Sequence, residues 1–195
     1  MKKGNWIYIN GGKYKGKKIF LPNSNTTRPS KSIVRNSIFD TLQNEIYNTT
    51  FIELFAGSGS VGFEAISRGS SELYLLEIDE VAIRTLYKNR KLFPDEKIEI
   101  IEGDSFKNIE TLLSKLSNRT ILYIDPPFSI RQGMENIYSR IYEVIEKVSD
   151  YPNIQQVILE HISKEKPPHQ IGKFQLYKSR KFGKTTISYY IQDTI

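Results

Sequence analysis

The chain has 195 residues, no cysteine and a formal net charge of +6, with 28 Lys and Arg residues against 22 Asp and Glu residues. Without cysteine, disulfides, cysteine-ligated metal centres and a cysteine nucleophile are excluded, and the length favours one domain with a substantial core. No apolar run is long enough to cross a bilayer and no signal-peptide core is visible, so we expect a cytoplasmic protein that does not associate with membranes.

Charge is distributed unevenly along the chain. Residues 1–39 hold nine Lys and Arg residues and no acid, whereas the remaining residues hold 19 basic and 22 acidic side chains. A basic N-terminus on a near-neutral body favours a polyanionic partner. A lysine-rich surface that contacts only solvent has the same composition, and that alternative stays open.

The N-terminal segment is predicted to form a hairpin. Residues 6–10 and 17–21 have the pattern of short strands, and the glycines at 11, 12 and 16 favour turns between them. Basic and aromatic side chains are interleaved, which suits phosphate contacts and base stacking: Tyr8, Lys13, Tyr14, Lys15, Lys17 and Lys18. The alternative is that Trp6 and Tyr8 pack on the core.

A helix is predicted after the polar residues 22–29. Ser30 is a suitable N-cap, and apolar residues then recur at helical spacing, with Lys31 and Arg35 on the other side: Ile33, Val34, Ile38, Leu42 and Ile46.

The segment from Phe51 to Gly62, FIELFAGSGSVG, predicts a strand, a tight glycine turn and a helix. Such a turn directs free backbone N–H groups at one point beyond the strand end. Its G-x-G-x-x-G spacing is shared by dinucleotide-binding folds and S-adenosylmethionine (SAM) methyltransferases. The spacing alone is also compatible with a plain strand–turn–helix junction.

Strands and helices then alternate to the end of the chain. Strands are predicted at 72–78, 97–101, 120–124 and 154–159, helices at 79–93, 105–116 and 134–148, and a closing strand pair at 174–178 and 185–192. This alternation predicts an α/β fold with a mostly parallel sheet and an antiparallel C-terminal edge pair. We expect one domain over 1–195, in which residues 1–30 form a basic arm and residues 31–195 the core.

Acidic residues follow successive strands, where ligands of open α/β sheets bind. Glu77 lies 20 residues after the glycine loop, at the distance typical of an acid that binds ribose hydroxyls. Asp104 is placed to accept a hydrogen bond from an adenine amino group. Each acid singly is also compatible with a helix N-cap.

The fourth strand is followed by Asp125, Pro126, Pro127 and Phe128. The prolines fix the backbone and remove two N–H donors, so the Asp125 carboxylate and the Pro126 carbonyl can both accept hydrogen bonds from one exocyclic amine. Phe128 offers a face for stacking a base. Two acceptors stabilise the positive charge that develops on an attacking aromatic amine. The structural alternative is a rigid turn before the next helix.

Taken together, these motifs resemble the SAM-dependent amino-methyltransferases of nucleic acids, and most closely the RsmD-like family of 16S ribosomal RNA guanine-N2 methyltransferases. The resemblance covers nearly the whole chain: the glycine-rich N-terminal element, Thr27-Arg28-Pro29, ELFAGSGSVGFEAISRG, the DPPF segment, Glu160 and the closing KFGKTTISYYI. Departures are mild, with Glu53, Ser30 and Ser70 where the family usually has Asp, Thr and Ala.

The resemblance implies a Rossmann-like methyltransferase fold and methyl transfer from SAM to a guanine N2 amine of 16S rRNA, within the small ribosomal subunit or an assembly intermediate. We expect a monomer and no metal. The predicted cofactor-binding residues are Glu53, Phe55, Ala56, Gly57, Ser58, Gly59, Glu77, Asp104 and Ser105. The target base is assigned to Asp125, Pro126, Pro127 and Phe128, and the rRNA to Lys13, Lys15, Lys17, Arg28, Lys31 and Arg35.

Three alternatives remain from the residues alone. DPPF-type sequences also serve adenine-N6 methyltransferases of RNA or DNA, although no separate target-recognition domain is visible. A dinucleotide-binding oxidoreductase shares the glycine loop but has no use for the prolines and Phe128. A non-catalytic RNA-binding ribosome assembly factor on the same scaffold is the third, and the intact Glu77 and Asp125 argue against it.

Overall fold

The computed structural model describes residues 5–23, 32–127 and 136–192. Arg28, Lys31 and Phe128 therefore lie outside the described residues. The chain divides into two compact units, residues 1–105 and residues 106–195, and each is described by itself.

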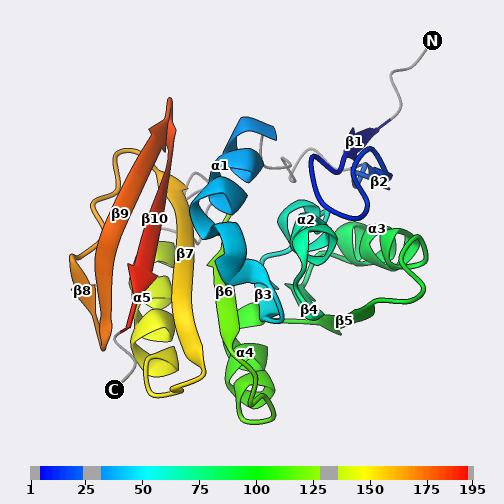
Figure 1. Cartoon of the computed structure of the whole chain (residues 1–195). Helices are drawn as coiled ribbons and strands as arrows, with labels where there is room; N and C mark the ends of the chain where they lie inside the picture. The colour runs from blue at the N-terminus through cyan, green and yellow to red at the C-terminus, as the bar shows by residue number, and fades with distance from the viewer. Residues whose placement is uncertain (1–4, 24–31, 128–135, 193–195) are drawn as a thin grey trace. The chain divides into compact units, whose positions relative to one another are not determined.

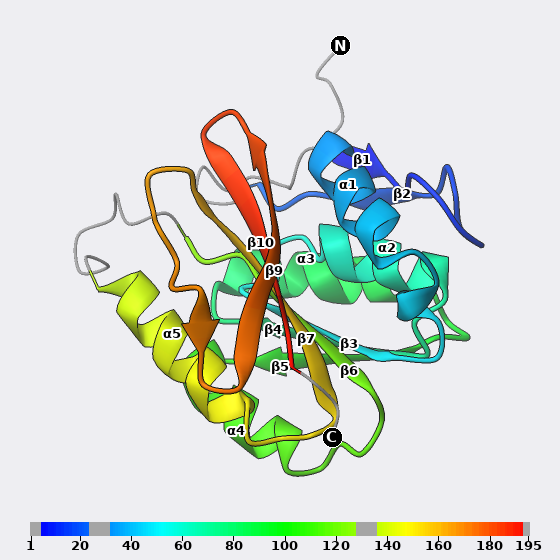
Figure 2. The ribbon, with the colours of Figure 1, turned by 60° about the vertical axis from the view of Figure 1, so that its left-hand side comes forward.

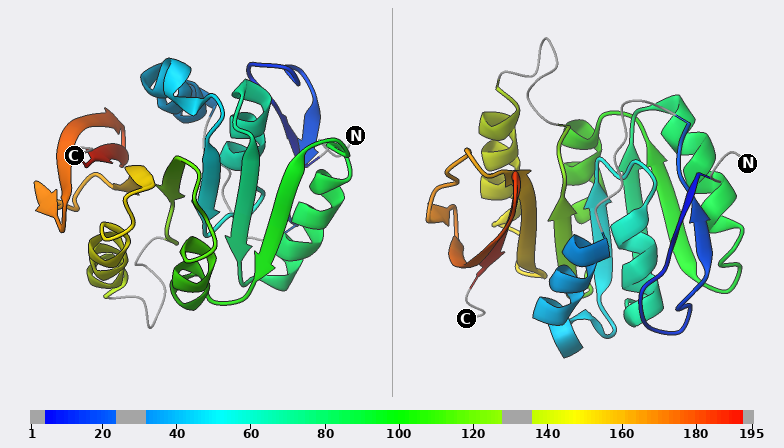
Figure 3. Two further views of the ribbon diagram at one scale, coloured as in Figure 1. Left: turned by 60° about the horizontal axis from the view of Figure 1, so that its bottom comes forward. Right: turned by 90° about the horizontal axis from the view of Figure 1, so that it is seen from above.

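The first unit combines a hairpin with a three-stranded parallel sheet. Its sheet has the order β5-β4-β3, and Figure 3 shows these strands side by side. The hairpin pairs Trp6 with Phe20 and Tyr8 with Lys18, and it lies beside α2 and α3 in Figure 1. In chain order the elements are β1 (Trp6–Tyr8), β2 (Lys18–Phe20), α1 (Ser32–Leu42), the 3-10 helix η1 (Gln43–Ile46), β3 (Thr50–Leu54), α2 (Ser60–Arg68), β4 (Glu72–Glu77), α3 (Glu80–Arg90) and β5 (Lys97–Glu102).

Burial and capping explain these elements. All five residues of β3 are buried, as expected of a strand that is covered on both faces. The Asp79 side chain accepts a hydrogen bond from the backbone N–H of Ala82 at 2.8 Å and so caps α3, at the residue where the sequence predicts that this helix begins. Helix α2 packs on β3 and β4, whereas α3 contacts β5 and the hairpin strand β2.

The second unit is a mixed sheet with helices. Strands β6 and β7 are parallel, and β7, β10, β9 and β8 continue from them as antiparallel neighbours. The long β9–β10 hairpin is the most extended part of this unit in Figure 2. Its elements are α4 (Ser105–Leu113, whose first residue belongs to the first unit), β6 (Thr120–Ile124), α5 (Ile137–Val148), β7 (Ile154–Ile162), β8 (Gln170–Ile171), β9 (Phe174–Phe182) and β10 (Thr185–Ile191).

The predicted α/β fold, with parallel strands, antiparallel C-terminal strands and an N-terminal hairpin, is confirmed. Three details differ. Strand β7 continues through Glu160 to Ile162 because β10 pairs with it over its whole length, and β9 runs to Phe182 for the same reason. The two-residue strand β8 was not predicted. Of the helices that the structure describes, none has the length and apolar character that crossing a membrane requires.

Candidate functional site

The glycine loop follows β3 directly. Gly57 and Gly59 have φ angles of 54° and 71°, and Phe55 shares this left-handed region with a φ of 59°. A Cβ atom on Gly59 would come within 2.7 Å of the Phe63 ring, so glycine is needed there for both conformation and space. A positive φ at a bulky residue such as Phe55 is costly and is typical of functional sites.

Two buried carboxylates hold this loop and the helix that follows it. Glu77 accepts hydrogen bonds from the backbone N–H of Gly57 at 2.6 Å, of Ile78 at 2.8 Å and of Asp79 at 2.9 Å. Glu53, only 3% exposed, accepts one at 2.7 Å from the N–H of Gly62 in the first turn of α2. A Cβ on Gly62 would lie 2.8 Å from that carboxylate oxygen, which explains the third glycine of the motif.

The ends of the three parallel strands are joined to one another. The N–H of Ala56 donates to the carbonyl of Leu76, and the N–H of Gly103 donates to the carbonyl of Glu77 at 2.8 Å. Asp104 is half-buried just after β5, and Ser105 begins α4. The structure thus brings together all nine predicted cofactor-binding residues around these strand ends, within the first unit: Glu53, Phe55, Ala56, Gly57, Ser58, Gly59, Glu77, Asp104 and Ser105.

Asp125 directly follows the fully buried strand β6 in the second unit, and Pro126 and Pro127 come after it. The neighbouring parallel strand brings Glu160 to this end, since Ile124 pairs with Leu159. Glu160 is buried and accepts a hydrogen bond of 2.5 Å from the Tyr123 hydroxyl. Burial raises the pKa of Tyr138, and the negative charges of Glu165, Asp125 and Glu160 add to that rise.

The predicted RNA-binding lysines have different surroundings. Lys13 forms an ion pair of 2.9 Å with Glu96, which raises the pKa of Lys13. Lys17 donates to the carbonyl of Leu92 at 2.6 Å and lies over the Tyr14 ring. Lys15 is exposed in the turn between them. Two of these lysines therefore also fasten the hairpin turn to the rest of the first unit.

Arg35 differs from its prediction. The sequence pattern placed it on the outer side of its helix, but it is 3% exposed and donates to the carbonyl of Tyr8 at 3.1 Å. The expectation of an exposed Arg35 was wrong because the hairpin covers this part of α1, a contact between residues 27 positions apart. In this position the Arg35 guanidinium supports β1 through its hydrogen bond to the carbonyl of Tyr8.

The outer face of the hairpin carries an aromatic and basic surface, defined by Trp6, Tyr8 and Lys18. Trp6 is 38% exposed and Tyr8 51% exposed, so they do not pack on the core. The Lys18 ammonium lies 4.7 Å from the centroid of the Trp6 ring and 5.8 Å from that of Tyr8. The Lys88 ammonium of α3 lies 3.3 Å from the centroid of the Phe20 ring, a contact between distant residues that sequence pattern does not predict.

Buried polar side chains of α2 hold the hairpin, and sequence reasoning missed them. Glu64 is fully buried and accepts hydrogen bonds from the backbone N–H of Asn10 at 2.7 Å, the N–H of Gly11 at 2.9 Å and Arg68 at 2.8 Å. Ser67 accepts from the N–H of Tyr14 at 2.9 Å and donates to the carbonyl of Gly11. Every residue of α2 from Ser60 to Ser67 is buried, so no helical periodicity distinguishes these two polar side chains in the sequence.

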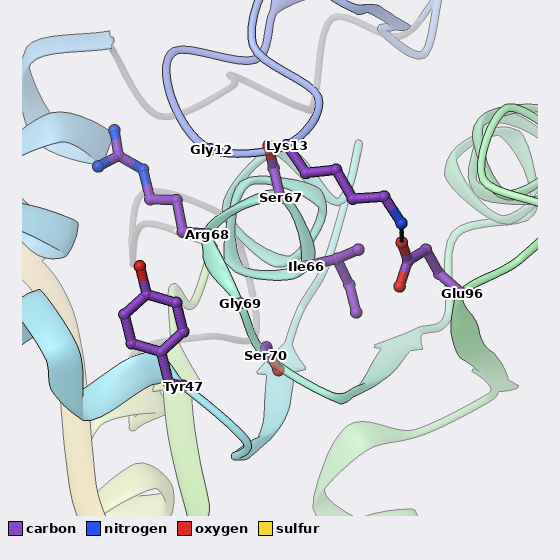
Figure 4. Close-up of a pocket in the computed structure, with 9 residues that line it drawn as sticks. All are labelled: Gly12, Lys13, Tyr47, Ile66, Ser67, Arg68, Gly69, Ser70 and Glu96. Carbon is purple, nitrogen blue, oxygen red and sulfur yellow. Dashed lines mark hydrogen bonds and ion pairs between the residues drawn. The ribbon is translucent and has the colours of Figure 1, made fainter.

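A hollow of about 330 Å³ lies at the C-terminal end of α2, and Figure 4 shows Lys13 reaching Glu96 on one side and Arg68 on the other. The end of a helix that exposes carbonyl groups is unfavourable for anions. None of the predicted cofactor-binding residues lines this hollow. Among the described residues, no group of three or more His, Asp or Glu side chains is arranged to hold a metal ion.

Comparison with known proteins identifies the family to which this chain is similar. The family model described as Conserved hypothetical protein 95 matches residues 7–191. Ribosomal RNA small subunit methyltransferase D of Buchnera aphidicola subsp. Acyrthosiphon pisum is 36% identical over 133 residues, which are 68% of this chain and 68% of that protein. Proteins of the same name from Escherichia coli and Haemophilus influenzae are matched over slightly less than two thirds of their own length, 62% and 64%.

Two solved structures show the same fold. A putative methyltransferase, yhhF, from Escherichia coli has a TM-score of 0.75 and 23% identity, covering 97% of this chain and 99% of that one. Magnesium protoporphyrin IX methyltransferase from Synechocystis PCC 6803, solved with bound SAM, has a TM-score of 0.56 and 13% identity, covering 83% and 79%. At these identities the likeness concerns the fold alone, which is the predicted Rossmann-like methyltransferase fold.

Proposed function

Since this chain belongs to the RsmD-like family, whose model is described as Conserved hypothetical protein 95, we propose that it is a methyltransferase that acts on ribosomal RNA with SAM as donor. In its finer form the proposal is transfer to the exocyclic N2 amine of a guanine in 16S rRNA. The observation that carries it is the Asp125-Pro126-Pro127 segment, directly after the buried strand β6, in a chain that also has the glycine loop and Glu77.

The first unit fits the cofactor. SAM carries ribose hydroxyls, an adenine amino group and a charged amino-acid end, so its site needs carboxylate acceptors and backbone that can be approached closely. The Glu77 carboxylate is fixed beside the glycine loop, and Asp104 follows the next strand. Glu77 would accept hydrogen bonds from the ribose hydroxyls and Asp104 one from the adenine amino group. The backbone around Phe55, Ala56 and Gly57 would line the amino-acid end.

Glu53 and the remaining loop residues support this site. The Glu53 carboxylate holds the N-terminus of α2 in place by its bond to Gly62. Ser58 and Gly59 shape the turn, and Ser105 begins the helix after Asp104. When bound, SAM supplies a sulfonium methyl group that is already a strong electrophile.

The second unit supplies the acceptors for the target amine. The Asp125 carboxylate and the Pro126 carbonyl would accept hydrogen bonds from its two protons, which favours a pyramidal nitrogen and stabilises the positive charge that develops on it. Pro127 keeps the segment rigid, and Phe128, outside the described residues, is proposed to stack on the base. Alignment of the reacting groups supplies much of the rate enhancement, worth several kcal/mol.

The hairpin is proposed as the rRNA-binding part. Lys13, Lys15 and Lys17, with Arg28 and Lys31 outside the described residues, would contact backbone phosphates, and the basic stretch from Lys164 to Lys184 would make further phosphate contacts. Arg35 would act indirectly, by supporting β1. We further propose that the two units act as one methyltransferase domain, as a monomer in the cytoplasm, on the small ribosomal subunit or an assembly intermediate.

The test uses tritiated SAM with three unmodified acceptors: small ribosomal subunits, naked 16S rRNA and duplex DNA. Digestion to nucleosides identifies the labelled product. N2-methylguanosine from subunits or rRNA is the expected result. N6-methyladenine would replace the guanine assignment by the adenine alternative, and no label in any acceptor despite bound SAM would favour a non-catalytic assembly factor.

A further inference from the structure

Asn89, near the end of α3, contacts both the hairpin and the glycine loop. Its side chain is fully buried. The Oδ1 atom accepts a hydrogen bond from the N–H of Phe20 at 2.7 Å, and Nδ2 donates to the carbonyl of Phe20 at 2.9 Å and to that of Ser58 at 3.2 Å. One amide group thus joins three segments that are 31 to 69 positions apart in the sequence.

On the hairpin side, the Asn89 amide pairs with the backbone of β2 in the way that a neighbouring strand would. It satisfies both backbone polar groups of Phe20, as an adjacent strand would. If the hairpin moved away from α3, these groups and the Asn89 amide would exchange their mutual hydrogen bonds for bonds to water, so each of these hydrogen bonds favours the docked hairpin. The position of β2 is therefore tied to Asn89.

Towards the loop, Asn89 fixes the peptide plane between Ser58 and Gly59. The Ser58 carbonyl points to Asn89, and the N–H of Gly59, on the opposite side of the same planar peptide, donates to the carbonyl of Ala56 at 2.7 Å. Glu77 holds the loop one residue earlier, at Gly57. The loop that would receive the cofactor is therefore held at two neighbouring points, one of which also holds the hairpin.

We propose that Asn89 couples RNA binding at the hairpin to cofactor binding at the glycine loop, so that each ligand raises the affinity for the other. This inference rests on the function proposed above. RNA that contacts both the outer face of the hairpin, at Trp6, Tyr8 and Lys18, and the adjacent Lys88 of α3 binds the docked hairpin better than an undocked one, and the docked hairpin favours the ordered loop. Coupling of this kind is reciprocal and typically changes affinity by about 5- to 150-fold.

The first experiment uses the wild-type chain and two probes, S-adenosylhomocysteine and naked 16S rRNA. Saturating rRNA should tighten the binding of S-adenosylhomocysteine, measured by equilibrium dialysis, about fivefold or more. In a separate sample without RNA, S-adenosylhomocysteine should slow hydrogen exchange of the Phe20 amide by a similar factor, because that N–H donates to Asn89. Unchanged affinity together with unchanged exchange would overturn the proposal.

The second experiment uses Asn89→Asp, which keeps an acceptor for the Phe20 N–H but has no N–H for the two carbonyls. Asn44→Asp, the same change at an exposed position of η1, is the matched control. The Asn89 variant should bind each probe but show less than about twofold mutual effect, whereas the control should behave like the wild type. Coupling that persists in Asn89→Asp would remove Asn89 from the proposal.

These outcomes separate the inference from the function it rests on. A wild-type chain that methylates rRNA but binds the two probes independently retains the proposed function and loses the coupling. A wild-type chain that binds no S-adenosylhomocysteine loses both. If Asn89→Asp does not fold, the exchange measurement on the wild type still tests coupling at the hydrogen bond between the Phe20 N–H and Asn89.

Discussion

The Glu77 carboxylate accepts a hydrogen bond from the backbone N–H of Gly57 at 2.6 Å. This hydrogen bond joins the acid at the end of β4 to the glycine loop 20 residues earlier. The side chain that shapes the loop is therefore also the one that is proposed to bind the ribose. A substitution at Glu77 is expected to act on both.

Glu77→Gln should weaken the binding of S-adenosylhomocysteine about tenfold or more, because hydrogen bonds to a charged group contribute about 1.5–3 kcal/mol. Isothermal titration calorimetry measures this. Glu102→Gln is the matched control, since Glu102 is paired with Glu77 across β4 and β5 but is exposed. Equal affinities in the two variants would remove Glu77 from the cofactor site.

Asp125→Asn should lower the rate of methyl transfer about 10²–10³-fold, the usual effect of losing one group that stabilises developing charge. The affinity for S-adenosylhomocysteine should stay unchanged, because Asp125 is assigned to the target amine. Asp150→Asn, an exposed change in the same unit, should keep full activity. A loss of cofactor affinity in Asp125→Asn would contradict the assignment.

The double variant Trp6→Ala, Tyr8→Ala should bind naked 16S rRNA about tenfold more weakly or worse, since base–aromatic stacking contributes about 1–3 kcal/mol per base. Filter binding at a fixed salt concentration is the measurement. Tyr47→Ala removes another exposed aromatic ring of the first unit and serves as the control. Unaltered RNA affinity in the double variant would show that the outer hairpin face is not the RNA surface.

Glu64→Ala should destabilise the chain by about 3–5 kcal/mol, because it leaves buried N–H groups and Arg68 without their carboxylate. Glu80→Ala is a matched control, since Glu80 also precedes an arginine by four residues but both side chains are exposed. Urea denaturation should show no measurable change for Glu80→Ala. Similar midpoints for the two variants would mean that Glu64 does not anchor the hairpin.

Stability should fall as the pH drops below about 6.5, the ordinary pKa of histidine. Burial lowers the pKa of His161, whose Nδ1–H donates to the carbonyl of Ile162 while Nε2 accepts from Ser188. The unfolded state then binds more protons than the folded one, so stability is lost as the pH falls towards the lowered pKa of the folded state. The neighbouring charges of Glu165 and Lys166 have opposite effects on this pKa.

Thermal unfolding between pH 7.5 and 5 measures this dependence. His161→Gln should flatten it, whereas His169→Gln, a change at the exposed histidine, should leave the wild-type slope. An unchanged slope in His161→Gln would assign the acid sensitivity to other groups.

Local pattern predicted most of the fold. The apolar runs of β3 and β6, the glycine turn and the start of a helix at Asp79 follow from residues next to one another in the sequence, and the structure has them where they were expected. Contacts between distant residues were not predictable in this way. Arg35 is buried by a hairpin 27 positions away, and Asn89 binds Phe20 across 69 positions.

In the candidate site, too, local features could be predicted and contacts between distant residues could not. Which side chains stand at the strand ends could be predicted, because parallel strands place their carboxyl ends together. That Glu53 faces the N–H of Gly62, and that Lys13 and Lys17 fasten the turn they belong to, depends on side-chain directions that no spacing reveals.

Strand β9 has a consequence for how copies of the chain behave in concentrated solution. The short β8 pairs only with Phe174 and Gln175, so the rest of β9 has β10 as its only strand neighbour among the described residues. An exposed strand edge invites pairing with the edge of another molecule, and lysine is a residue that opposes it. Lys178, Arg180 and Lys181 lie along this edge, so edge-to-edge pairing of two copies would bring like charges together, and we expect this to oppose aggregation.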